Sequence, residues 1–233
     1  MRRRSLLLTL LILVVTVGLV AAGLYTLARR EPAFYTAAVR DTSGPDSTAD
    51  VGLVVTRVTE LREDLRVGRP QWQAAFTATE LNALFAELLD PGRDLSDSLP
   101  PGITAPRVAI DDDRILVGVR VQAGPGRVAS DATTTVLSIE LRPWLVKGEP
   151  NVVAVEVVGV WAGGLPVSSQ RYLDRFADAM RGANVDVTWY RTNGNPVALM
   201  KLYADQPRPP TVVRTLTVAD GKVTVGGQAA AGP

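Results

Sequence analysis

Residues 115–121 read ILVGVRV, and branched apolar side chains occupy every second position of this stretch. Strict alternation is typical of a β-strand with one buried face, because successive side chains of a strand point to opposite sides. The same period returns at residues 137–141 and 153–157, and turn residues separate the stretches. The sequence therefore predicts an α+β protein built on a curved antiparallel β-meander of about seven or eight strands, packed by two or three helices.

The clearest helix signal lies before the meander, at residues 77–90. Thr77 and Glu80 have the spacing of a capping box, in which each side chain binds the backbone N–H of the other residue. The helix carries one unbroken apolar stripe, formed by Leu81, Leu84, Phe85, Leu88 and Leu89. This stripe fits ordinary core packing, and it also fits the wall of a hydrophobic cavity.

Two further segments have helical spacing. Apolar residues within 53–65 predict an amphipathic helix that Asp50 caps and Gly68 ends. A second pattern predicts a helix that begins at residue 168 or 169 and has Gly182 as its C-cap.

The last third of the domain predicts two β-hairpins. Residues 185–191 and 196–203 flank an Asn-Gly pair, and residues 211–218 and 222–225 flank an Asp-Gly pair. Both dipeptides favour the tight turns that join antiparallel strands. Residues 227–233 are expected to form a frayed tail.

An uncharged run precedes all of these elements, at residues 5–28 (SLLLTLLILVVTVGLVAAGLYTLA), with arginines on both sides. At 1.5 Å per residue it covers roughly 36 Å, which is enough to cross a hydrocarbon core of about 30 Å. We expect a transmembrane helix with the N-terminus in the cytoplasm. A cleaved signal peptide is the alternative, because residues 20–22 resemble a cleavage site, but the run is longer than a signal sequence needs.

This reading divides the chain into four parts. Residues 1–30 form a cytoplasmic tip and anchor, residues 31–50 a flexible tether rich in Pro, Gly, Ser and Thr, residues 51–226 an extracytoplasmic domain, and residues 227–233 the tail. The expected location is the cytoplasmic (inner) membrane, crossed once, with the bulk of the chain on the periplasmic side.

Composition narrows the chemistry. The chain after the anchor has 22 basic and 24 acidic residues, so nucleic acid is not an expected partner. The sequence has no cysteine and no histidine, which removes the commonest nucleophiles, general bases and metal ligands. We therefore expect a protein that is not an enzyme and that uses neither a cofactor nor a metal.

Acidic residues offer the two remaining chemical candidates. Asp111–Asp113 could bind a hard cation, but three consecutive residues of a turn point in different directions, so a solvated turn is favoured. Hydrolysis by paired carboxylates would require Glu80 and Glu87 to converge in a cleft. Seven residues of one helix place them about 10 Å apart.

Tryptophans are the candidates for contact with a bilayer interface, because indole is amphipathic. Trp161 and Trp189 fall on the apolar side of their predicted strands and are expected in the core. Trp72 and Trp144 lie beside prolines at the ends of elements and are the membrane-interface candidates.

The order of these elements resembles the YpmS-type family of uncharacterised bacterial membrane-anchored proteins. The resemblance covers roughly residues 70–226 and rests on FTATELNAL at residues 76–84, which has a T-x-x-x-L-N pattern, and on GLPV at residues 164–167. More loosely, helices laid on a curved meander resemble tubular lipid-binding domains. That resemblance implies a groove for a membrane lipid, walled by Leu81, Leu84, Phe85, Leu88, Val117, Val119, Val155 and Val157.

The sequence is compatible with two functions. The first is a non-enzymatic extracytoplasmic domain that binds a lipid or another hydrophobic ligand in a groove between the 77–90 helix and the sheet. The second is a tethered protein-interaction module that contacts an envelope protein through a sheet edge or a helix face.

Overall fold

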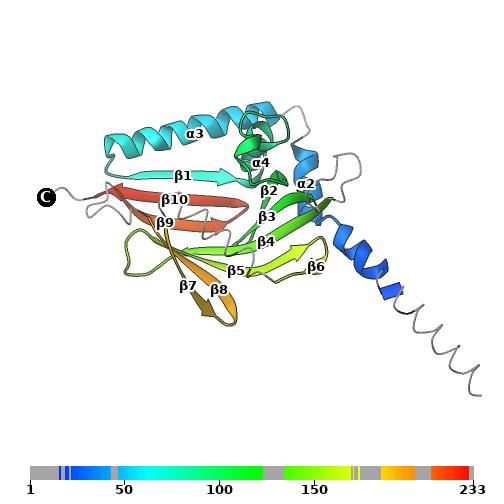
Figure 1. Ribbon diagram of the computed structural model, residues 1–233. Coiled ribbons are helices and arrows are strands. Elements are labelled where there is room, and N and C mark those ends of the chain that lie inside the picture. The colour runs from blue at the N-terminus through cyan, green and yellow to red at the C-terminus, as the bar shows by residue number, and fades with distance from the viewer. Residues whose placement is uncertain are drawn as a thin grey trace, which may run out of the picture.

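The fold is α+β, with ten strands in two antiparallel sheets and three labelled helices among the described residues (Figure 1). The structure is a computed structural model that describes residues 16, 19–20, 22–42, 47–122, 134–168, 170, 173, 185–202 and 211–230. The predicted α+β class is therefore confirmed. The predicted helix from residue 168 to Gly182 lies almost wholly outside the described residues.

The larger sheet contains the predicted meander. Its strands follow the order β2-β3-β4-β5-β8-β7, and the short β6 pairs with β5. The alternating stretches lie in three neighbouring strands, where Val117 is paired with Ile139 and Leu141 with Val157. The strand bounds are β2 Ile103–Asp111, β3 Arg114–Gln122, β4 Thr134–Leu145, β5 Val152–Ala162, β6 Leu165–Pro166, β7 Asp186–Thr192 and β8 Asn195–Lys201.

The smaller sheet has the order β1-β10-β9 and joins segments far apart in the sequence. Its strands are β1 Trp72–Thr77, β9 Thr211–Ala219 and β10 Lys222–Ala229. The predicted hairpin is confirmed, whereas β1 was not predicted. The expected fraying is wrong for residues 227–229, because β10 continues through them and pairs Gly227 with Trp72.

Three helices pack near the small sheet and the β2 edge (Figure 1). They are α2 Ala33–Asp41, α3 Ser47–Val67 and α4 Ala78–Leu89. The capping box of α4 is confirmed, since Thr77 and Glu80 bind each other's backbone N–H groups. The α3 helix begins before Asp50, which therefore lies in its first turn instead of capping it.

The apolar face predicted for α3 is only partly buried. Val54 is fully buried, but Leu53 remains 56% exposed and Val58 43% exposed. The spacing of the apolar residues correctly predicted a helix. It did not show how much of the apolar face is buried.

Helix α2 corrects the expectation of a flexible tether over residues 31–50. Its Tyr35 is fully buried and donates a hydrogen bond of 2.7 Å from its hydroxyl group to the carbonyl oxygen of Ala105. The ring lies where Gly118 has no side chain, since an ideal Cβ there would be 2.7 Å from Tyr35 Cδ2. The buried Tyr35 thus anchors this short helix to the large sheet.

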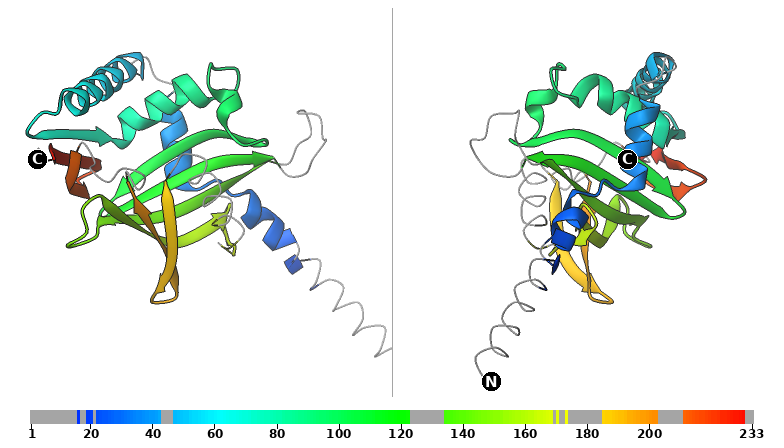
Figure 2. Two further views of the ribbon diagram at one scale, coloured as in Figure 1. Left: turned by 60° about the vertical axis from the view of Figure 1, so that its left-hand side comes forward. Right: turned by 90° about the vertical axis from the view of Figure 1, so that its right-hand side faces the viewer.

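Most of the predicted transmembrane run lies outside the described residues. Residues 22–29, at its C-terminal end, are helical and lead from the domain in Figure 2. In the part of the chain that the structure describes, no helix is both long and apolar enough to span a membrane.

Candidate functional site

Helix α4 lies along the outer edge of the large sheet, where β2 has one side without a neighbouring strand. Asn82 supplies the missing partner: its amide donates to the carbonyl oxygen of Val108 at 2.8 Å and accepts from the Val108 N–H at 2.7 Å. Both free backbone groups of Val108 are thereby satisfied. The asparagine of the T-x-x-x-L-N pattern thus attaches α4 to the sheet edge.

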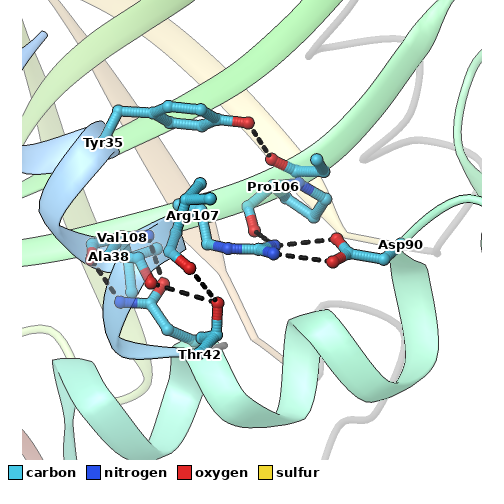
Figure 3. A network of polar contacts seen from close by, with 10 residues as sticks. Tyr35, Ala38, Thr42, Asp90, Pro106, Arg107 and Val108 are labelled. Carbon is cyan, nitrogen blue, oxygen red and sulfur yellow. Dashed lines mark hydrogen bonds and ion pairs between the residues drawn. The ribbon is translucent and has the colours of Figure 1, made fainter. Parts of the chain in front are cut away.

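A buried ion pair strengthens the same junction (Figure 3). Arg107 is only 3% exposed at its side chain and binds both carboxylate oxygens of Asp90, at 2.9 and 2.7 Å. It also donates to the carbonyl oxygen of Pro106 at 2.7 Å. The Arg107–Asp90 pair connects the end of α4 to β2 and therefore has a structural role.

The pKa values of two other groups reflect their structural contacts. Burial raises the pKa of Tyr35, and the nearby Arg120 and Arg107 only partly oppose this effect, so the phenol stays a neutral donor. Burial also raises the pKa of Glu80, but hydrogen bonds from the Thr77 backbone and from Arg57 outweigh it and leave the pKa lowered. Glu80 is therefore an ionised helix cap.

The predicted groove between α4 and the sheet is not where the structure has its apolar cavity. A cavity of about 260 Å³ lies on the large sheet, and its described lining is entirely apolar: Val117, Ile139, Leu141, Val155, Val157, Val160, Leu173, Trp189 and Ala198. Three predicted groove residues, Val117, Val155 and Val157, belong to it. Val119 packs against the neighbouring core cluster.

The four groove residues predicted on the helix, Leu81, Leu84, Phe85 and Leu88, are half-buried and are absent from this lining. The reason is the position of α4, which packs on β2, α3 and α2 at the edge of the sheet. Six lining residues were not predicted, among them Trp189 and Ala198, which face each other across the β7–β8 pair. The alternation of β7 placed Trp189 on the apolar side of its strand, but the sequence could not indicate that this side lines a cavity.

Two more polar hollows adjoin the apolar cavity. One, of about 290 Å³, shares Leu173 and Trp189 with it and adds Gln170, Tyr190, Arg191 and Pro196. The other, of about 480 Å³, shares Val157 and Val160 with it and extends to Pro166 and Val167. Arg191 lines both hollows and is the one charged side chain in the described part of their lining.

The corner between β5 and β6 holds the end of the predicted anchor helix. The Gly164 N–H donates to the carbonyl oxygen of Leu27 at 2.7 Å, and the Thr135 hydroxyl donates to the carbonyl oxygen of Ala28. Gly163 has a φ of 59°, and a Cβ there would overlap the Ala28 carbonyl. The last carbonyls of the helix are therefore capped by the sheet, and only glycine fits at this contact.

Three of the acidic candidates form ion pairs with arginines. Glu80 is buried and bound to Arg57 at 2.7 Å, while Glu87 is half exposed and lies 3.5 Å from Arg93. Asp113, in the turn, forms ion pairs with Arg114 of β3 and Arg142 of β4. Among the described residues, no group of three potential ligands could hold a metal ion.

The structure does not separate the tryptophans into core and membrane-interface residues as the sequence predicts. Trp72 is 8% exposed and donates from its indole to the Thr211 hydroxyl at 2.8 Å, so the prediction that it meets a bilayer is wrong. Trp144 is half-buried in β4, and its role at an interface stays a prediction. Trp189 lines the apolar cavity as a core residue should, and Trp161 lines the larger polar hollow.

No family model, curated protein or solved structure matches this chain. The apolar cavity, its two polar neighbours and the capped helix end are therefore the observations on which a function can be argued.

Proposed function

We propose that this chain is a membrane-anchored, extracytoplasmic domain that is not an enzyme and that binds the hydrocarbon part of a lipid in the apolar cavity. The observation that carries the proposal is the described lining of that cavity, nine apolar residues with no charged or hydrogen-bonding side chain except the Trp189 indole. Such a surface favours hydrocarbon over water.

The volume limits the ligand. About 260 Å³ is larger than the roughly 150 Å³ of a cavity that holds benzene and smaller than the roughly 300–1,000 Å³ of sites for drug-sized molecules. Part of one alkyl chain fits, whereas two long acyl chains do not. Burying eight methylene groups would contribute roughly 6 kcal/mol before the cost of association.

The position of the cavity supports a ligand that comes from the bilayer. The larger polar hollow adjoins the cavity and includes Pro166 of β6, two residues after the Gly164 that holds Leu27. Figures 1 and 2 both place β6 beside the helix that leads toward the predicted span. If residues 5–28 cross the cytoplasmic membrane, this side of the domain lies nearest the lipid headgroups.

The resemblance to the YpmS-type family is part of this proposal and adds the same expectation of a tethered envelope protein. The order of α4, the meander and the GLPV corner supports the likeness.

A cavity-filling substitution tests the proposal. We expect Val155→Phe to reduce labelling of β4 and β5 by an uncharged, diazirine-bearing alkyl probe at least fivefold, without lowering the melting temperature, because the ring occupies the space of the ligand. The measurement is peptide mass spectrometry after irradiation of the full-length chain in phosphatidylcholine nanodiscs.

The matched control is Val55→Phe, the same change at a residue that is 49% exposed on α3 and outside the cavity. It should label like the unaltered protein. Equal labelling of β4 and β5 in all three proteins would contradict a ligand site in this cavity.

One observation favours the second candidate function, a tethered protein-interaction module. Val55 and Val58, three residues apart on one face of α3, are 49% and 43% exposed. An apolar helix face of this kind is a common docking surface for another protein.

A further inference from the structure

The β7–β8 hairpin carries both an apolar wall and a cation on one face. Trp189 is paired with Ala198, and Arg191 is paired with Pro196. Side chains two residues apart on a strand share a face and are about 7 Å apart along it. The hairpin therefore leads from the apolar cavity at Trp189 and Ala198 to a guanidinium group near its turn.

Arg191 is available to a ligand. Its side chain is exposed, and its guanidinium donates one hydrogen bond of 3.0 Å, to the carbonyl oxygen of Gly194 in the same hairpin. No carboxylate in the described part of the chain forms an ion pair with it. Glu156, which Asn195 contacts at 2.7 Å, is already bound to Arg142.

A polar hollow connects the apolar cavity with Arg191. The hollow of about 290 Å³ is lined by Leu173 and Trp189, which also line the apolar cavity, and by Arg191. A ligand in both spaces would place its hydrocarbon part against apolar side chains and its polar end beside a fixed positive charge. Guanidinium groups bind carboxylate and phosphate oxygens through paired, charge-assisted hydrogen bonds.

We infer that the ligand is an anionic amphiphile with a single alkyl chain, and that Arg191 binds its carboxylate or phosphate head group. This inference rests on the proposed function, because it names the ligand class of the same cavity. The single chain follows from the cavity volume, and the anionic head follows from the sign of the only charge in the described lining of the adjoining hollows.

Competition against the uncharged alkyl probe tests the inference in full-length protein in nanodiscs. Dodecanoate and dodecyl phosphate should displace the probe at concentrations about tenfold or more below that of 1-dodecanol, because only the first two present an anion to Arg191. In Arg191→Gln this preference should disappear, while the concentration of 1-dodecanol needed for displacement stays unchanged. Arg191→Lys should retain part of the preference.

Arg214→Gln is the matched control, since Arg214 is an exposed arginine on β9 of the other sheet and lines neither the cavity nor its two neighbours. It should keep the full preference, which separates a local contact from a change in net charge.

The possible failures are distinguishable. Equal displacement by the three compounds, or a preference that survives Arg191→Gln, would overturn the head-group inference and leave hydrocarbon binding in place. If neither the probe nor any competitor reaches β4 and β5, both the inference and the proposed function fail.

Discussion

Asp90→Ala should lower the free energy of unfolding by about 2–4 kcal/mol. The substitution leaves the guanidinium of Arg107, which is 3% exposed, without the carboxylate that binds it at two positions. Removing one partner of a buried pair costs about 3–5 kcal/mol, and the 29% exposure of the Asp90 side chain lowers the expected cost by about 1 kcal/mol. Urea denaturation followed by tryptophan fluorescence measures the loss.

Two variants show whether the loss arises from the unpaired charge. Asp94→Ala removes an exposed aspartate in the next loop and should change the free energy by less than about 0.5 kcal/mol. Adding Arg107→Leu to Asp90→Ala should recover part of the loss, because it removes the buried charge as well. An Asp90→Ala protein as stable as the unaltered chain would show that the pair does not hold α4 to β2.

Gly163→Val should release the end of the predicted anchor helix from the domain. The valine would need a φ of 59°, which is strongly unfavourable for a β-branched residue, and its Cβ would overlap the Ala28 carbonyl. The contacts of Gly164 with Leu27 and of Thr135 with Ala28 should be lost as the backbone moves apart. We expect trypsin to cleave after Arg29 and Arg30 at least tenfold faster, measured by mass spectrometry of the digest.

Gly148→Val distinguishes the effect of backbone strain from the effect of the overlap with Ala28. Gly148 has a φ of 86°, but a Cβ there meets no atom within 4 Å. This variant should suffer similar backbone strain in the β4–β5 turn without faster cleavage at the arginines. If Gly163→Val and the unaltered protein are cleaved at the same rate, the sheet does not hold the helix end.

Features with a local cause were predictable from the sequence. The capping box of Thr77 and Glu80 lies within one turn of helix, and the Asn193–Gly194 turn determines its hairpin through the backbone preferences of two residues. The central meander was predictable for the same reason, since the alternation within each strand shows which side chains are buried together.

Features that depend on distant partners were not predictable. Strand β1 is short, and its neighbour β10 lies about 150 residues further along the chain. No local sequence pattern therefore predicts β1. Helix α2 is held by the fit of Tyr35 over Gly118 and by its bond to Ala105, and both of these partners lie far along the chain.

Three of the four strand residues predicted for the groove line the apolar cavity, and none of the four predicted helix residues does. An apolar stripe shows that one face of a helix is covered, but it does not identify the covering element. The position of α4 depends on Asn82, because its two hydrogen bonds to Val108 place the helix at the edge of the sheet. Arg191 was not singled out, since a lone arginine near a turn is ordinarily a solvated residue.

The most direct test of hydrocarbon binding is mass spectrometry of the organic extract of the purified full-length chain, compared with the Val155→Phe variant purified in parallel. We expect close to one molecule of a single-chain anionic amphiphile for each unaltered chain, and a several-fold smaller amount for the variant. A folded, unaltered chain that carries no more amphiphile than Val155→Phe would contradict the proposed function and would favour the protein-interaction module, with the exposed face of α3 as its contact surface.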